Sequence, residues 1–173
     1  MTILLSQVKI ADTRSPFNGL VKDILIKDQQ IVSITDKYKG VADQTIDLKN
    51  SIVSPGFIDP FVHFCDPGME HRETLSTGSN AAIQGGFTTV FVVPNTTPVI
   101  DNKSQVTYVK QHSQELPIHI LPIGALSKKI EGKDLAEMID MHSNVAVAFS
   151  DGSYPVQSTL LFFWPPSSTI ASQ

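Results

Sequence analysis

The strongest constraint on the fold of this 173-residue chain is a series of apolar, β-branched runs in its second part. The runs span residues 57–64, 88–94, 118–123 and 144–149, and they recur at intervals of about 30 residues, the size of one strand–helix–strand unit. Each run is continuously apolar rather than alternating, which is typical of strands covered on both faces. The pattern therefore predicts an α/β fold with a parallel sheet and crossover helices.

Polar stretches with helical spacing separate these runs, at residues 73–86, 101–115 and 132–142. The first ends in a glycine pair suited to a helix C-terminus. The second starts with Asp101 or Asn102 as its N-cap and places Val106 and Val109 on one face. In the third, four side chains recur at the spacing of a single helical face: Leu135, Met138, Ile139 and His142. We expect a helix over each stretch.

The first 54 residues read as short strands joined by turns, which indicates a small β domain. Residues 21–36 predict a hairpin that turns at Asp28 and Gln29, and residues 45–56 add one more strand. We therefore divide the chain into a β domain over residues 1–54, an α/β part over residues 55–161 and a divergent tail over residues 162–173. Adjacent prolines in that tail, Pro165 and Pro166, oppose a helix there.

Composition narrows the class of protein. The chain is 41% hydrophobic and 17% charged, with a net charge of −4 and no basic block, which argues against nucleic-acid binding. The longest apolar runs are far shorter than the ~20 residues that span a bilayer, so we expect no membrane association. The N-terminus does not resemble a signal peptide, and the single cysteine, Cys65, allows no internal disulfide. These features favour a soluble cytoplasmic protein.

The stretch FIDPFVHFCDPG, residues 57–68, reads as a buried strand that runs into a tight turn. Because side chains on a strand alternate between faces, we expect Asp59, Phe61, His63 and Cys65 to point the same way. A metal hydrolase would place two imidazoles on such a face, one residue apart. This chain offers one imidazole and a phenyl ring.

Three segments resemble the dihydroorotases of the amidohydrolase superfamily. They are that stretch, GGFTT at residues 85–89 and PNTTPVIDN at residues 94–102. The likeness follows the segment order over about residues 1–161. It implies the N-terminal half of a (β/α)8 barrel, with residues 55–161 forming four βα units and residues 1–54 part of a small β domain. It also implies the family's reaction, the zinc-dependent hydrolysis of the cyclic amide of dihydroorotate to N-carbamoyl-aspartate in pyrimidine biosynthesis.

Three positions carry the family's functional residues by resemblance. His63 matches the second histidine of the zinc-binding pair, and Asp151 matches the carboxylate at the end of the fourth strand, so both are candidate metal ligands. Asn95 matches the asparagine that binds the substrate. Each also has a structural alternative: a hydrogen-bonded histidine at a strand end, a turn-forming aspartate before Gly152, and an asparagine that caps a loop.

Two positions depart from the family pattern. Phe61 stands where the first histidine is expected, and a phenyl ring has no lone pair for a metal. Cys65 stands where an arginine holds the substrate carboxylate, and a thiol cannot replace a bidentate guanidinium. The family's remaining ligands come from its fifth and sixth strands, which would lie beyond Gln173. The ligand count therefore predicts that this chain alone does not hold zinc stably and is not a working dihydroorotase.

Three functional interpretations remain open. In the first, the chain is a cyclic-amide hydrolase that holds its metal in an unusual way. In the second, it is a non-catalytic dihydroorotase-like paralogue that assembles with aspartate transcarbamoylase; the sequence pattern is closest to such paralogues. The third is a fragment without a function of its own, in which the divergence after Leu161 reflects a change of reading frame. Since half a barrel exposes a sheet edge, we expect a protein partner or self-association to cover it.

Overall fold

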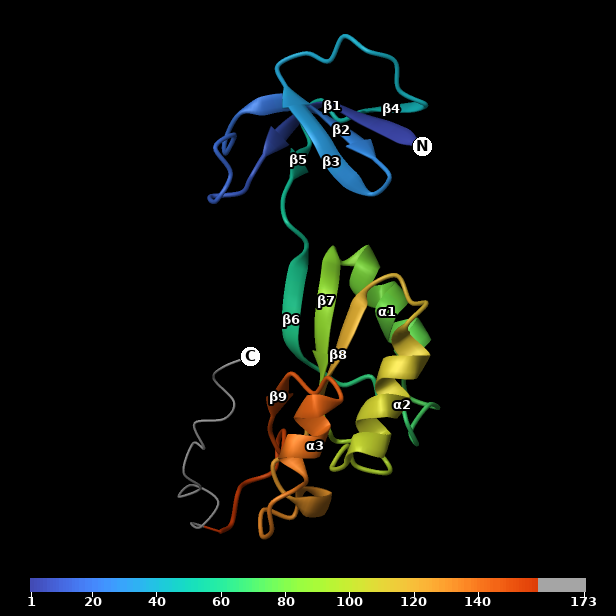
Figure 1. Ribbon diagram of the computed structural model, residues 1–173, viewed down its shortest axis with the longest axis vertical. Helices are drawn as coiled ribbons and strands as arrows, with labels where there is room; N and C mark the ends of the chain where they lie inside the picture. Colours follow the sequence, from blue (N-terminus) through green and yellow to red (C-terminus); the bar gives the residue numbers. More distant parts are fainter. Residues whose placement is uncertain (159–173) are drawn as a thin grey trace. The chain divides into compact units, whose positions relative to one another are not determined.

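The computed structural model describes residues 1–158, which fall into two compact units, Met1–Pro55 and the residues from Gly56 onward (Figure 1). The tail expected over residues 162–173 lies outside the described residues. Within residues 1–158, none of the helices has the length and apolar character needed to cross a membrane.

The first unit is a five-stranded sheet of β1 (Thr2–Ile10), β2 (Val21–Lys27), β3 (Gln30–Thr35), β4 (Gln44–Asp47) and β5 (Ile52–Val53). The β2–β3 hairpin is confirmed, and both of its turn residues, Asp28 and Gln29, have the positive φ that a two-residue hairpin turn favours. Residues 45–56 form two short strands rather than the single one expected. Both strands pair parallel to β1, and the chain turns between them at Asn50, where φ is 69°.

A bulge interrupts β1 at Gln7, where φ is 60° and the pairing with β2 shifts register. The buried carboxylate of Asp23 fixes this bulge. It accepts hydrogen bonds from the backbone N–H of Gln7 at 2.9 Å and from that of Tyr38, also at 2.9 Å. Both carboxylate oxygens are therefore used inside the unit. The unit's core is built around Val8, Ile10 and Ile24.

The second unit contains a parallel sheet in the order β6 (Phe57–Val62), β7 (Phe87–Val92), β8 (His119–Gly124), β9 (Ala148–Phe149). Its helices are α1 (Leu75–Gln84), α2 (Lys103–Ser113) and α3 (Met138–Ser143), with a short 3-10 turn η1 (Lys128–Ile130). Helices α1 and α2 lie on the same side of the sheet (Figure 1). The predicted α/β class with parallel strands and crossover helices is confirmed.

The first two helices follow their sequence signals. Thr74 caps α1 through a reciprocal pair of hydrogen bonds with Thr77, and Gly85 ends the helix. Asn102 caps α2, whose Val106 and Val109 are fully buried against the sheet. These apolar side chains join Val90, Val92 and Ile120 of the strands in one core.

The third helix differs from the prediction over residues 132–142, because it begins only at Met138. Leu135 lies instead in an isolated bridge to Ser127. The buried residue of α3 is Met141, whereas Ile139 is 73% exposed. The helix is shortened because the preceding residues form backbone hydrogen bonds with the segment after β8, such as Ala136 N–H to Leu126 O at 3.0 Å.

The expectation that every strand is covered on both faces is wrong for β6. Phe57, Ile58 and Phe61 are 56%, 60% and 47% exposed. The physical reason is that β6 is an edge strand, paired only with β7 among the described residues. The apolar side chains of β6 therefore form a surface that the described part of the chain does not cover.

Candidate functional site

The loops that follow β6, β7 and β9 meet at the carboxyl end of the parallel sheet, where barrel enzymes place their chemistry. They form a hollow of about 400 Å³ lined by His63, Cys65, Met69, Arg72, Asn95, Ser153 and Tyr154. Two of the sequence-predicted residues, His63 and Asn95, are thus brought together. The third, Asp151, is not among the lining residues.

His63 lies just beyond β6 and is exposed. Its ring meets that of Phe61 edge-on, with 5.7 Å between the ring centroids. The phenyl ring occupies the place where the family pattern has a second imidazole. This pair of side chains therefore provides one nitrogen-bearing ring instead of two.

The predicted alternation of side chains between the two faces of the strand ends before Cys65. The strand ends at Val62, and Cys65 adopts a left-handed conformation with φ of 59°. Its thiol is buried and donates a long hydrogen bond of 3.8 Å to the carbonyl of His63, while the imidazole is exposed. The two-residue periodicity of a strand could not predict that the strand ends at Val62 and that the chain turns at Cys65.

Asp66 is a buried residue that the sequence reasoning missed. Its carboxylate accepts a hydrogen bond from the backbone N–H of Leu75, at the start of α1, at 3.1 Å. It accepts a second from the Tyr108 hydroxyl on α2 at 2.8 Å. Burial of the phenol, reinforced by the bond to Asp66, raises the pKa of Tyr108 to about 12. Asp66 therefore fastens the loop after β6 to both helices.

The loops after β6 and β7 pack backbone against backbone. Thr97 N–H donates to Pro67 O at 3.0 Å. Gly68 has a φ of +94°, and a Cβ atom there would lie 1.7 Å from the Thr97 carbonyl oxygen. Only glycine permits this approach.

Asn95 joins the ends of β7 and β9. Its side-chain amide donates to the backbone carbonyl of Asp151 at 3.3 Å. Its Oδ1 atom is buried and has no hydrogen-bond partner among the described residues. A Cβ atom at Gly152 would lie 2.0 Å from that oxygen, so a side chain there would displace the Asn95 amide.

Asp151 is 3% exposed, and its carboxylate serves the loop after β8. Oδ1 accepts from the backbone N–H groups of Leu126 and Ser127, each at 2.9 Å. Oδ2 accepts from the Ser127 hydroxyl at 2.5 Å. The same hydroxyl oxygen accepts from Gly132 N–H at 2.7 Å. Both carboxylate oxygens are therefore already bound to protein donors.

The side chains that the structure describes do not fit a zinc ion. Residues 1–158 contain no group of three or more histidine, cysteine, aspartate or glutamate side chains placed to hold a metal. His63 faces a phenyl ring, and the carboxylate of Asp151 is occupied by Leu126 and Ser127. A catalytic zinc site needs about three protein ligands.

The family model described as Dihydro-orotase-like matches residues 50–165, which is more than half of the chain. The chain belongs to the dihydroorotase-like family. It is 37% identical over 164 residues to a dihydroorotase of Syntrophus aciditrophicus, covering 93% of this chain and 38% of that protein. It is 44% identical over 138 residues to a dihydroorotase of Thermoanaerobacter sp. strain X514, covering 79% of this chain and 32% of that protein.

Solved structures of related proteins share the fold. An L-hydantoinase (dihydropyrimidinase) from Arthrobacter aurescens superposes with a TM-score of 0.71 at 26% identity, covering 85% of this chain and 32% of its own. A dihydroorotase superposes with a TM-score of 0.63 at 18% identity, covering 86% and 41%. The second unit is thus the N-terminal half of a barrel of the amidohydrolase type. This dihydroorotase-like chain spans less than two fifths of the length of the two curated relatives named above.

Proposed function

We propose that this dihydroorotase-like chain acts in pyrimidine biosynthesis in the cytoplasm without hydrolysing dihydroorotate by itself. The observation that carries the proposal is the bonding of Asp151, whose carboxylate is taken up by the Leu126 and Ser127 donors. Phe61 supports it, because the ring beside His63 provides no lone pair. Without a metal-activated water, the family reaction lacks its nucleophile.

The hollow still provides polar groups for a ligand. Asn95, at the position of the family's substrate-binding asparagine, shares the hollow with His63 and Arg72. We infer that Asn95 is the surviving ligand contact. A metal held by His63 and Asp151 would require the Asp151 carboxylate to release Leu126 and Ser127, which would leave a buried hydroxyl and two backbone N–H groups without acceptors.

Metal analysis and a ring-opening assay test this proposal. We expect the purified chain to contain far less than one equivalent of zinc and to convert no dihydroorotate above the buffer rate, even after incubation with zinc. The dihydroorotase of Syntrophus aciditrophicus, assayed in parallel, is the positive control. Near-stoichiometric zinc together with steady ring opening would show that the chain is a hydrolase.

A second candidate function is assembly with another protein. The exposed apolar residues of β6, Phe57, Ile58 and Phe61, favour it, since a surface of this kind is usually covered. Following the family resemblance, we propose aspartate transcarbamoylase as the partner, with self-association as the alternative. Size-exclusion chromatography of the two proteins at micromolar concentration tests this: co-elution supports assembly, and independent migration refutes it. Light scattering of the chain alone tests self-association.

A further inference from the structure

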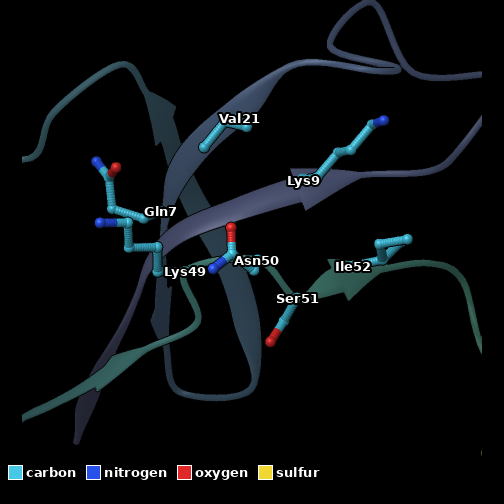
Figure 2. Close-up of a pocket in the computed structure, with 7 residues that line it drawn as sticks. All are labelled: Gln7, Lys9, Val21, Lys49, Asn50, Ser51 and Ile52. Atoms are coloured by element: carbon cyan, nitrogen blue, oxygen red, sulfur yellow. The ribbon is translucent and has the colours of Figure 1, made fainter.

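A second hollow, of about 400 Å³, lies on the first unit and takes no part in the proposed function. Figure 2 shows the side chains around it: Gln7, Lys9, Val21, Lys49, Asn50, Ser51 and Ile52. The lining contains two lysines, two amides and one hydroxyl together with two apolar residues, and none of these described residues is acidic.

One wall is a row of side chains across three strands. Lys9 on β1 pairs directly with Val21 on β2 and with Ile52 on β5. Side chains at paired positions project from the same face of a sheet, so the Lys9 side chain starts between two apolar side chains. Val21 and Ile52 are 52% and 66% exposed, although both are strongly apolar.

The other wall is the turn formed by residues 49–51 between β4 and β5. Its backbone is tied to β1, because Lys9 N–H donates to Ser51 O at 3.1 Å. Gln7 lies at the bulge that Asp23 fixes, so the backbone under both walls is held by hydrogen bonds. Lys9 and Lys49 stand on opposite sides of the hollow with Asn50 between them (Figure 2).

The two ammonium groups lack carboxylate partners within the described part of the chain. The ion pairs found there within 4.0 Å involve other cations. Asp47 accepts the backbone N–H of Lys49 at 3.1 Å but lies outside ion-pairing distance of its ammonium. Asp23 is turned inward to Gln7 and Tyr38. The hollow is thus a local cationic site in a chain of net charge −4.

We propose that this hollow binds a small organic dianion whose two negative groups are separated by an apolar segment. One anionic end contacts Lys9 and the other Lys49, and the part of the apolar segment next to the first end lies against Val21 and Ile52, which flank Lys9. The amides of Gln7 and Asn50 supply neutral hydrogen-bond donors beside the charges. The spacing of the two lysines then sets the preferred length of the ligand.

Titration of the isotope-labelled full chain with α,ω-dicarboxylates of increasing length, succinate, adipate and suberate, tests the proposal by NMR. We expect amide shifts concentrated at the lining residues, with the highest affinity at one of the three lengths. Lys9→Gln and Lys49→Gln should each weaken that affinity about twofold to fivefold, the range for a solvent-exposed charge pair. Lys39→Gln, which removes an exposed lysine outside the hollow, should leave it unchanged.

The uncharged diamide of adipate and the monocarboxylate hexanoate separate the possible outcomes. Weak or absent binding of both supports recognition of two charges. The proposal is overturned if the diamide binds as well as adipate, if Lys39→Gln weakens binding as much as Lys9→Gln, or if no lining residue shifts at millimolar dicarboxylate. All three lysine variants alter exposed side chains, and the spectrum of each reports whether it is folded.

Discussion

The Ser127 hydroxyl donates a 2.5 Å hydrogen bond to the carboxylate of Asp151, 24 positions further along the chain. This bond joins the loop after β8 to the segment after β9 in the interior of the second unit. With the two backbone donors at Leu126 and Ser127, it makes Asp151 a structural acceptor. The residue that matches a metal-facing carboxylate in the family therefore holds a loop here.

Removal of this acceptor should destabilise the second unit. We expect Asp151→Ala to lower the free energy of unfolding by about 2–4 kcal/mol, because it strands buried N–H and O–H donors. Asp151→Asn should cost less, since its amide oxygen can still accept the two N–H bonds. Urea unfolding measures both values, and hydrogen exchange at the Leu126 and Ser127 amides localises the effect. The control is Asp134→Ala, at an exposed site; equal stability of the two alanine variants would contradict the structural role.

The contact between Gly68 and Thr97 can be tested with a matched pair of glycines. Both Gly68 and Gly86 have positive φ, but a Cβ atom would meet backbone at 1.7 Å in the first and a phenyl ring at an ordinary 3.4 Å in the second. Gly86→Ala should therefore cost about 1 kcal/mol from backbone strain alone. Gly68→Ala should cost a further ~1–3 kcal/mol from overpacking. Thermal or urea unfolding decides, and similar costs at both sites would refute the close approach of the two loops.

The Tyr108–Asp66 hydrogen bond predicts a loss of stability at alkaline pH. The pKa of Tyr108 is raised from 10.0 to about 12, chiefly by burial, so the folded state favours the neutral phenol. This contribution is complete below pH 10 and is lost as the pH rises toward about 12, because the unfolded chain ionises first. The melting temperature should fall across that interval, and Tyr108→Phe should reduce the fall.

The ultraviolet absorbance of phenolate provides a second measurement of the same prediction. We expect a late rise in phenolate absorbance near pH 12, from the ionisation of Tyr108. Tyr108→Phe should remove that late step. If the late step persists in the variant, the raised pKa belongs to another residue.

Local signals in the sequence predicted the elements that depend on neighbouring residues. The β2–β3 turn follows from Asp28 and Gln29, and the start of α2 follows from Asn102. The late start of α3 could not be predicted this way, because residues 128–136 hydrogen-bond to one another and to the segment after β8. The role of Asp151 escaped prediction for the same reason, since its donors lie 24 and 25 positions away.

The position of Phe61 allows a gain-of-function test of the proposal that this ring prevents zinc binding. In Phe61→His, a second imidazole would face His63 across the present ring contact of 5.7 Å, and zinc binds imidazole nitrogen at about 2.0–2.1 Å. We expect this variant to bind zinc and to show a zinc-dependent rise in melting temperature that the parent chain lacks. Ring opening should stay absent, because two imidazoles fall short of the roughly three ligands of a catalytic site.

The matched control is Phe57→His, which places an imidazole on the same exposed strand without a histidine neighbour. A common surface effect of added histidine would raise zinc binding equally in both variants. Binding by Phe61→His alone would show that the phenyl ring is what separates His63 from a metal pair. If the parent chain binds zinc as tightly as Phe61→His, then His63 already has other metal ligands, and the proposal that the Phe61 ring prevents zinc binding fails.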